Sequence, residues 1–410
     1  RDSINRVGFI LLRSKDNGLT WNQLYNGLFP SNINCFNKLN ISATMADSTN
    51  PKVLLSYCCN YNEDTNYFDI MDVVRCACEP FAFEKSFCNI QTVAYHDISH
   101  AWDNDYPALN ANPNSVGTLF SRTKVKDSLI FLSSSDGGMS FNNHKVVAIS
   151  INNIHKVALA YGRSLSQNTG QYYAVWEEQA DSTSNLGHIF ASHSNPNFNS
   201  PFTTPVMLDG LDPSLTNLCR NPVIACQANN IDNDSSNVTE VILFEKYDST
   251  THEYDIIGFY NKKAATGTTF SRMNIATGLH NQLQPDITFN SFDSTFVVTY
   301  YDSTDQKLVM LKNDMNLTNP DNWIIVSTGY NDSYTLSAPH PKISVNMGNH
   351  SVITGWSADR ENGNGVALFD APYVPNAGFN EEHDNGTLSL IGVSPNPCNT
   401  SITISFRMIK

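Results

Sequence analysis

Charged side chains are scarce in this sequence. They make up 16% of its 410 residues, whereas soluble proteins average about 25%. Basic residues are the scarcer kind, with 25 Lys and Arg against 39 Asp and Glu, which gives a net charge of −14. No basic run is present, and an acidic surface repels nucleic acid and anionic lipid. We therefore expect no nucleic-acid partner.

Long apolar runs and metal-binding patterns are also absent. No apolar stretch reaches the length of about 18 residues that a membrane-spanning helix needs, so we expect none. The eleven His form no H-x-x-x-H or HExxH pattern, so we expect no transition metal and no cofactor. Two oxygen-rich turns, 103–105 and 232–234, leave Ca²⁺ open, but they lack the ligand spacing of an EF-hand. Solvated turns are the simpler interpretation.

The sequence has no initiator Met and no signal peptide. It begins at Arg1, which predicts a processed or trimmed N-terminus.

Cysteine is more frequent than in most cytosolic proteins, at nine residues. Two of them, Cys219 and Cys226, are close in sequence, and Cys398 stands alone. No C-x-x-C knuckle occurs, which argues against structural zinc. Disulfides in an oxidising compartment are the better explanation, with Cys219–Cys226 as the best single pair. The remaining six are in one segment: Cys35, Cys58, Cys59, Cys76, Cys78 and Cys88.

A turn phrase occurs twice, as SKDNGLTW at 14–21 and SSDGGMSF at 134–141. In a hairpin of this kind the Asp accepts backbone N–H groups, the Gly adopts positive φ, and the aromatic residue starts the return strand. A weaker copy, GTTF, lies at 267–270. The phrase resembles the Asp box of sialidases and related β-propellers, which lies on the outer rim, away from any active site. The resemblance implies structural roles for Ser14, Asp16, Gly18, Trp21, Ser134, Asp136, Gly138 and Phe141.

A longer repeat runs beneath these turns. Each unit has a short alternating strand, a strand that ends in an aromatic residue, and a third apolar strand, as at 156–159, 173–176 and 188–191. A looser fourth strand follows, as at Trp323. Four short antiparallel strands per unit are typical of propeller blades. Tandem immunoglobulin domains are the alternative, but they would not explain the turn phrases.

The repeat predicts an all-β chain with a β-propeller of four-stranded antiparallel blades over residues 1–371. Six complete units start near residues 39, 106, 155, 221, 285 and 341. The N-terminal piece carries only a third and a fourth strand. We therefore expect a seven-bladed ring whose missing strands come from upstream sequence.

The C-terminal segment has a different character. Residues 372–386 read as a linker, and residues 387–410 hold a Pro-Asn-Pro turn between two alternating strands. This pattern resembles the start of the type IX secretion C-terminal sorting domain, a small β-sandwich that is truncated here. The resemblance implies export by the type IX machinery of a Bacteroidota-type bacterium, and a secreted or outer cell-surface location.

Propeller ligands usually bind at the mouth of the central channel, on loops that lead into the innermost strands. The sialidase resemblance implies three Arg that clamp a carboxylate, a Tyr nucleophile backed by a Glu, and an Asp acid/base. The sequence has no Arg-Ile-Pro motif, and only Arg220 directly precedes an innermost strand. Spacing does not support Tyr300 or Tyr161 paired with Glu245 or Glu177, so we assign no catalytic residue. The predicted ligand-binding residues are Trp102, Asp103, Asp105, Arg220, His280 and His340.

The triplet Asp-Ser-Thr, or a close variant of it, recurs along the chain. It resembles the O-glycan acceptor of the same bacterial phylum, although Asp and Ser are also common in hairpin turns. The candidate glycosylation sites are Ser48, Ser128, Ser182, Ser249, Ser294 and Ser303.

Together these patterns predict a non-catalytic binding or structural module on the bacterial exterior, with a carbohydrate or a surface protein as partner. One alternative is a sialidase-like glycoside hydrolase. Another is a self-assembling subunit of an extracellular filament or surface layer.

Overall fold

A computed structural model gives the fold of most of the chain. It describes residues 8–13, 22–28, 35–44, 52–60, 70–77, 82–86, 94–102, 115–123, 127–138, 140–141, 144–164, 170–180, 186–195, 201–215, 218–228, 237–329, 339–345, 351–359, 365–373, 387–394 and 403–409. Within these residues the chain is all-β, apart from one 3₁₀ turn, η1 (Asp209–Leu211). The described part contains no helix with the length and apolarity needed to cross a bilayer.

Five antiparallel sheets have four strands each, paired in chain order. The first contains β3 (Cys35–Thr44), β4 (Lys52–Asn60), β5 (Ile70–Ala77) and β6 (Ala82–Ser86). The second contains β7 (Ala94–Trp102), β8 (Val116–Thr123), β9 (Asp127–Ser134) and β10 (Lys145–Ser150). The third contains β11 (Asn153–Gly162), β12 (Gln171–Gln179), β13 (His188–His193) and β14 (Val206–Met207). The fourth contains β15 (Cys219–Ala228), β16 (Val238–Asp248), β17 (Glu253–Asn261) and β18 (Ser271–Ala276). The fifth contains β19 (Gln282–Asn290), β20 (Thr295–Asp302), β21 (Lys307–Asp314) and β22 (Ile324–Thr328).

Three smaller sheets complete the described structure. A two-stranded sheet at the N-terminus pairs β1 (Gly8–Arg13) with β2 (Asn22–Leu28). A three-stranded sheet follows β22 and contains β23 (Lys342–Val345), β24 (Val352–Asp359) and β25 (Gly365–Tyr373). A separate C-terminal hairpin pairs β26 (Thr387–Ser394) with β27 (Thr403–Ile409).

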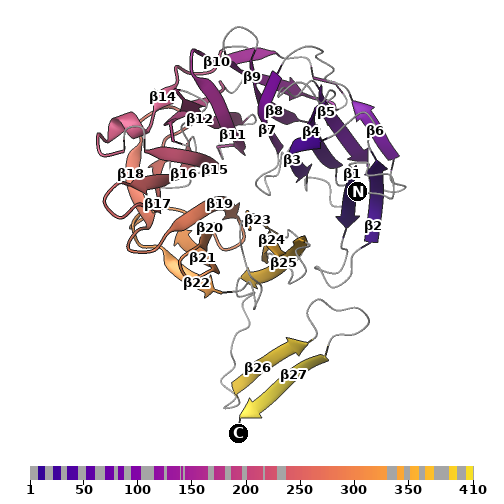
Figure 1. Cartoon of the computed structure of the whole chain (residues 1–410), viewed down its shortest axis with the longest axis vertical. Helices are drawn as coiled ribbons and strands as arrows, with labels where there is room; N and C mark the ends of the chain where they lie inside the picture. The colour runs from indigo at the N-terminus through magenta and orange to yellow at the C-terminus, as the bar shows by residue number, and fades with distance from the viewer. Residues whose placement is uncertain are drawn as a thin grey trace.

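From the β3–β6 sheet to the β23–β25 sheet, the sheets follow one another around a common centre, and each places its first strand innermost, as Figure 1 shows. Consecutive innermost strands are in contact, from β3 through β7, β11, β15 and β19 to β23. This arrangement is a β-propeller, as the sequence repeat predicts. We call the side of the ring on which the innermost strands begin the leading face, and the opposite side the trailing face.

The hydrophobic core lies between neighbouring sheets. The β11–β14 and β15–β18 sheets pack through Tyr173, Ile242 and Phe244, which are fully buried. The next interface uses Val241 and Phe296 in the same way. The β15–β18 sheet therefore buries both of its faces against its neighbours, which a ring of blades achieves and an isolated blade cannot.

The predicted strand order is confirmed for most units, but one predicted start is wrong. The unit predicted near residue 106 begins instead with β7, at Ala94. The segment Asp97-Ile98-Ser99 repeats the pattern Asp286-Ile287-Thr288 of β19. Pro107, at the predicted start, resembles Pro222, Pro285 and Pro341, which lie near the starts of three other innermost strands.

Some end-of-chain predictions stay untested. The first unit begins at Cys35, and the unit predicted near residue 341 has three described strands rather than four. The seven-bladed count, the linker and the sorting domain remain predictions. The β1–β2 sheet agrees with an N-terminal piece of two strands.

The second turn phrase has the predicted turn geometry. Asp136 Oδ1 accepts the N–H of Ser140 at 2.9 Å, and Ser134 Oγ accepts the N–H of Gly138 at 2.8 Å. Gly138 has a φ of 84°, a conformation that an L-residue adopts only at a cost. Phe141 does not start the return strand, because β10 begins at Lys145. The first copy, with Ser14, Asp16, Gly18 and Trp21, lies outside the described residues.

Candidate functional site

Four innermost strands carry a residue with left-handed backbone at the leading face. Lys156, Asn221, Gln284 and His340 have φ of 48°, 55°, 57° and 44°. Such values are uncommon for residues other than Gly. The first three lie in β-bulges of β11, β15 and β19, where an extra residue interrupts the strand pairing. The fourth lies directly before β23. The leading face therefore repeats one strained position in sheet after sheet.

The neighbouring sheet accepts the N–H of these residues. Asn221 N–H donates to Glu177 Oε2 at 2.9 Å, and Gln284 N–H donates to Glu245 Oε1 at 2.8 Å. The N–H of His340 donates to Gln284 Oε1, also at 2.8 Å. In each case the acceptor belongs to the sheet before the donor's. These side chains therefore join consecutive blades at the leading face.

Aspartates at the start of innermost strands make the same kind of bond. Asp97 Oδ2 accepts the N–H of Val157 at 3.1 Å, from the next sheet. Asp286 Oδ2 accepts the N–H of Ile343 at 3.0 Å, again from the next sheet. Charge-assisted bonds of this type are stronger than neutral ones.

Glu245 is the most heavily bonded side chain of the leading face, and its carboxylate is fully buried. Arg220 Nε donates to its Oε2 at 2.6 Å. Asn221 Nδ2 and Gln284 N–H both donate to Oε1, at 2.9 and 2.8 Å. The guanidinium of Arg220 also lies over the Tyr254 ring, 3.8 Å from its centroid. Arg220 is thus held from two sides and is directed toward the protein rather than toward solvent.

Electrostatic effects show which charges are close together. Burial raises the pKa of Glu177, although Asn221 N–H, Gln179, Lys156 and Arg220 each oppose the rise. Burial lowers the pKa of His340, and the charges of Lys156 and Lys342 lower it further. Lys156 belongs to β11 and His340 precedes β23, so these charges act on each other across the centre of the ring. Lys156 and Lys342 are exposed beside His340, and Lys342 Nζ lies 3.5 Å from Asp286 Oδ1.

The structure places three of the predicted ligand-binding residues at the leading face: Arg220, His280 and His340. Trp102 is misplaced, because it ends β7 at the trailing end of an innermost strand. The error follows from the wrong start of that unit. Asp103 and Asp105 lie outside the described residues.

Tyr161 and Tyr300, the tyrosines considered as partners of Glu245 or Glu177, lie in other parts of the fold. Tyr161 lies near the trailing end of β11, where its hydroxyl accepts the N–H of Gly170 at 2.8 Å. Tyr300 belongs to the core between the β15–β18 and β19–β22 sheets. Tyr254, which the sequence prediction missed, is the tyrosine that Arg220 contacts. The X-Pro pairs within β15 and β19 and before β23 are the signal that could have located Asn221, Gln284 and His340.

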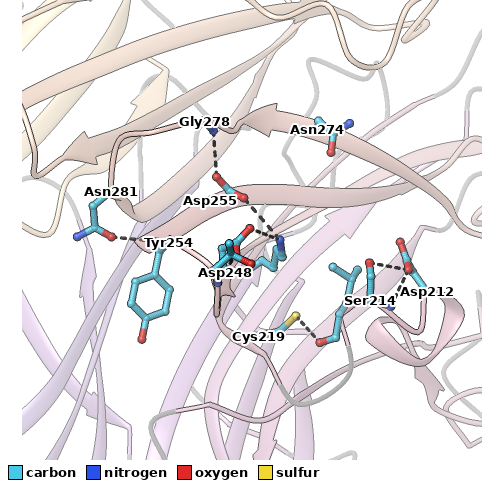
Figure 2. A network of polar contacts seen from close by, with 12 residues as sticks. Asp212, Ser214, Cys219, Asp248, Tyr254, Asp255, Asn274, Gly278 and Asn281 are labelled. Carbon is cyan, nitrogen blue, oxygen red and sulfur yellow. Dashed lines mark hydrogen bonds and ion pairs between the residues drawn. The ribbon is translucent and has the colours of Figure 1, made fainter. Parts of the chain in front are cut away.

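The predicted Cys219–Cys226 disulfide is wrong. Both residues lie on β15, and seven steps along a strand span roughly 23 Å at about 3.3 Å per residue. A disulfide needs Cα atoms within about 7 Å. Figure 2 shows the Cys219 thiol, which donates to the backbone oxygen of Leu215 at 3.4 Å. The other cysteine pairings and the oxidising compartment remain predictions.

The Asp-Ser-Thr triplets form turns. Asp248 Oδ1 accepts the N–H of Thr250 at 2.8 Å, and Asp302 Oδ1 accepts the N–H of Thr304 at 3.1 Å. Ser249 is exposed at such a tip. Ser128 does not lie at a tip, because it is within β9. Ser294 and Ser303 lie between strands, and Ser48 and Ser182 are outside the described residues. Glycosylation of these serines stays a prediction.

Comparison with known proteins found no matching family model and no matching curated protein. Among solved structures, the chain is similar to a protein of unknown function from Dyadobacter fermentans, at 9% identity and a TM-score of 0.47, over 82% of this chain and 95% of that one. It is also similar to the NanB sialidase of Streptococcus pneumoniae, at 8% identity and a TM-score of 0.47, over 85% of this chain and 67% of that one. A sialidase of Trypanosoma rangeli matches at 6% identity and a TM-score of 0.45, over 89% of this chain and 58% of that one.

Proposed function

We propose that this chain is a non-catalytic binding propeller, and that its ligand docks at the centre of the leading face. The observation that carries the proposal is the arrangement around Glu245. Its carboxylate is fully buried and accepts three hydrogen bonds that hold Arg220, Asn221 and the next sheet. A carboxylate committed in this way has no room to transfer a proton to a substrate, and Arg220 is paired instead of open to a ligand carboxylate.

The ligand that this face suits best is an acidic carbohydrate. Exposed Lys156 and Lys342 place two positive charges beside His340, on a chain whose net charge is −14. Opposite charge speeds and orients the encounter with an anionic partner. Strained backbone is often concentrated where a protein contacts ligand, and Lys156 and His340 are two of the strained residues.

The proposal places the protein outside the cell. Its support is the Pro-Asn-Pro segment of residues 387–410 and its resemblance to a type IX sorting signal. Expression in a Bacteroidota host, followed by fractionation, should recover the chain in the medium or at the cell surface. Retention in the cytoplasm would contradict this location.

The binding test uses the whole chain on a panel of neutral and acidic oligosaccharides. We expect selective capture of acidic members, with a strong salt dependence. The double variant that carries Lys156→Gln and His340→Gln should lose this capture of acidic oligosaccharides. Lys263→Gln is the matched control, since this exposed lysine belongs to a turn beyond the end of β17, away from the leading face. Equal loss in both variants, or capture of no glycan, would contradict the proposal and favour a surface protein as partner.

A further inference from the structure

A second group of polar side chains lies at the start of β19, away from the Glu245 bonds. His280, Asp302 and Asp305 each offer one ligand atom, and these atoms lie within 4.8 Å of one another. His280 Nδ1 is 2.8 Å from Asp302 Oδ2. Sequence patterns missed the group because 22 positions separate His280 from Asp302, and the pairing of β19 with β20 brings them together.

A buried oxygen without a partner points to the same place. Gln282 is directly opposite Asp302 in the pairing of β19 with β20, so the two side chains extend from the same face of the sheet. Gln282 is 5% exposed. Its Oε1 is buried and has no hydrogen-bond partner among the described residues. A buried amide oxygen left unbonded costs free energy, and a cation beside Asp302 would satisfy it.

The loop that carries His280 is held firmly to the hairpin that carries the aspartates. Asn281 N–H donates to Thr304 Oγ1 at 2.9 Å, and Asn281 Nδ2 donates to Ser303 Oγ at 2.7 Å. The N–H of Ser303 donates back to the Asn281 backbone oxygen at 2.9 Å. Asn281 Oδ1 also accepts the N–H of Tyr254, as Figure 2 shows. The ligand atoms are therefore positioned in advance.

The electric field at His280 is negative. The carboxylates of Asp302 and Asp305 lie beside the imidazole, and Asp302 Oδ2 is 2.8 Å from His280 Nδ1. The same field attracts a divalent cation. One cation already lies nearby, because Lys307 Nζ is 3.3 Å from Asp305 Oδ2 in an exposed pair. An exposed pair of this kind contributes little, so a metal ion can displace it.

We propose that His280, Asp302 and Asp305, with Gln282 Oε1, form a site for a divalent transition-metal ion of the Zn²⁺ type. The imidazole nitrogen decides the class, since Zn²⁺ and its neighbours accept mixed nitrogen and oxygen ligands, whereas Ca²⁺ and Mg²⁺ favour oxygen alone. These residues offer four donor atoms, which is the number that a structural zinc ion takes. The bound ion would fix the start of β19 to the β20–β21 turn.

Calorimetric titration of the purified chain with Zn²⁺ tests the site. We expect one ion per chain and a higher Tm when Zn²⁺ is present. Asp305→Asn should remove both effects. Gln282→Met, which keeps the size of the side chain and removes the amide oxygen, should weaken binding about 10–100-fold, as loss of a supporting group does at other metal sites.

The control is His144→Ala, which removes an exposed histidine before β10 and should leave the binding unchanged. Asp305 is an exposed turn residue, so its Asn variant should fold, and its Tm without metal verifies this. Absence of Zn²⁺ binding would overturn the proposal, as would binding that survives Asp305→Asn. Binding of Ca²⁺ in preference to Zn²⁺ would overturn the assignment to a transition metal.

Discussion

At the scale of single residues, buried carboxylates do two different things in this protein. Glu245 accepts hydrogen bonds from Arg220, from the Asn221 side chain and from the N–H of Gln284. Glu240 is also buried, at 2% exposed, and desolvation raises its pKa to about 8. The first carboxylate joins blades, and the second is carried as a neutral acid at the interface of the β11–β14 and β15–β18 sheets.

Removal of the Arg220 guanidinium should destabilise the protein strongly. Arg220→Ala leaves Glu245 buried without its cation, which costs about 3–5 kcal/mol in comparable pairs. The side chain of Arg220 is 22% exposed, so we expect the lower end of that range. Arg272→Ala breaks an ion pair with Asp212 that is more exposed, and should cost less than about 1 kcal/mol. Urea unfolding of both variants measures the difference, and equal losses would show that Glu245 does not depend on Arg220.

The raised pKa of Glu240 predicts how stability changes with pH. The folded state holds this proton up to about pH 8, while the ordinary value is 4.5. Its stabilising effect is therefore complete below pH 4.5, declines as pH rises toward 8, and is lost above it. The free energy of unfolding of Glu240→Gln should match that of the parent protein near pH 5. Above pH 8 it should be higher by a few kcal/mol, since each pKa unit is about 1.4 kcal/mol. Unfolding free energies that differ by a constant amount from pH 5 to pH 9 would contradict this.

At the scale of elements, the sequence predicts strands well where polar and apolar residues alternate regularly. Residues 173–176 and 296–300 lie in β12 and β20 as predicted. The failure at β7 has a physical cause: Pro favours the starts of innermost strands elsewhere, and Tyr106-Pro107 imitates that signal. The pairing of Arg220 with Glu245 could not be predicted, because it depends on the bulge in β15 and on the register of β15 with β16.

The turn between β9 and β10 offers a test at this scale. Gly138 has a φ of 84°, and a side chain in left-handed backbone costs roughly 1–2 kcal/mol. Gly138→Ala should lower stability by that amount. Gly267→Ala is the matched control, because its φ is outside the left-handed range and a new Cβ would only touch Lys263 O at 3.7 Å. Thermal unfolding distinguishes the two, and a neutral Gly138→Ala would show that the turn does not require glycine.

At the scale of the whole molecule, the propeller is held together by apolar cores between sheets and by side chain to backbone bonds at the leading face. Glu177, Glu245 and Gln284 each accept an N–H from the next sheet. The same polar residues that make a propeller mouth look catalytic from sequence are used here to connect blades. The proposed acidic ligand would meet Lys156, Lys342 and His340 at this face.

The central claim is that the leading face binds without catalysis. It is tested most directly by the release of a fluorogenic leaving group from sialosides by the purified whole chain. We predict no release above the buffer rate, and the same result for Arg220→Lys, which keeps the charge but loses the planar fork. Robust turnover by the parent chain that disappears in a folded Arg220→Lys variant would contradict the account and establish a sialidase-like hydrolase instead.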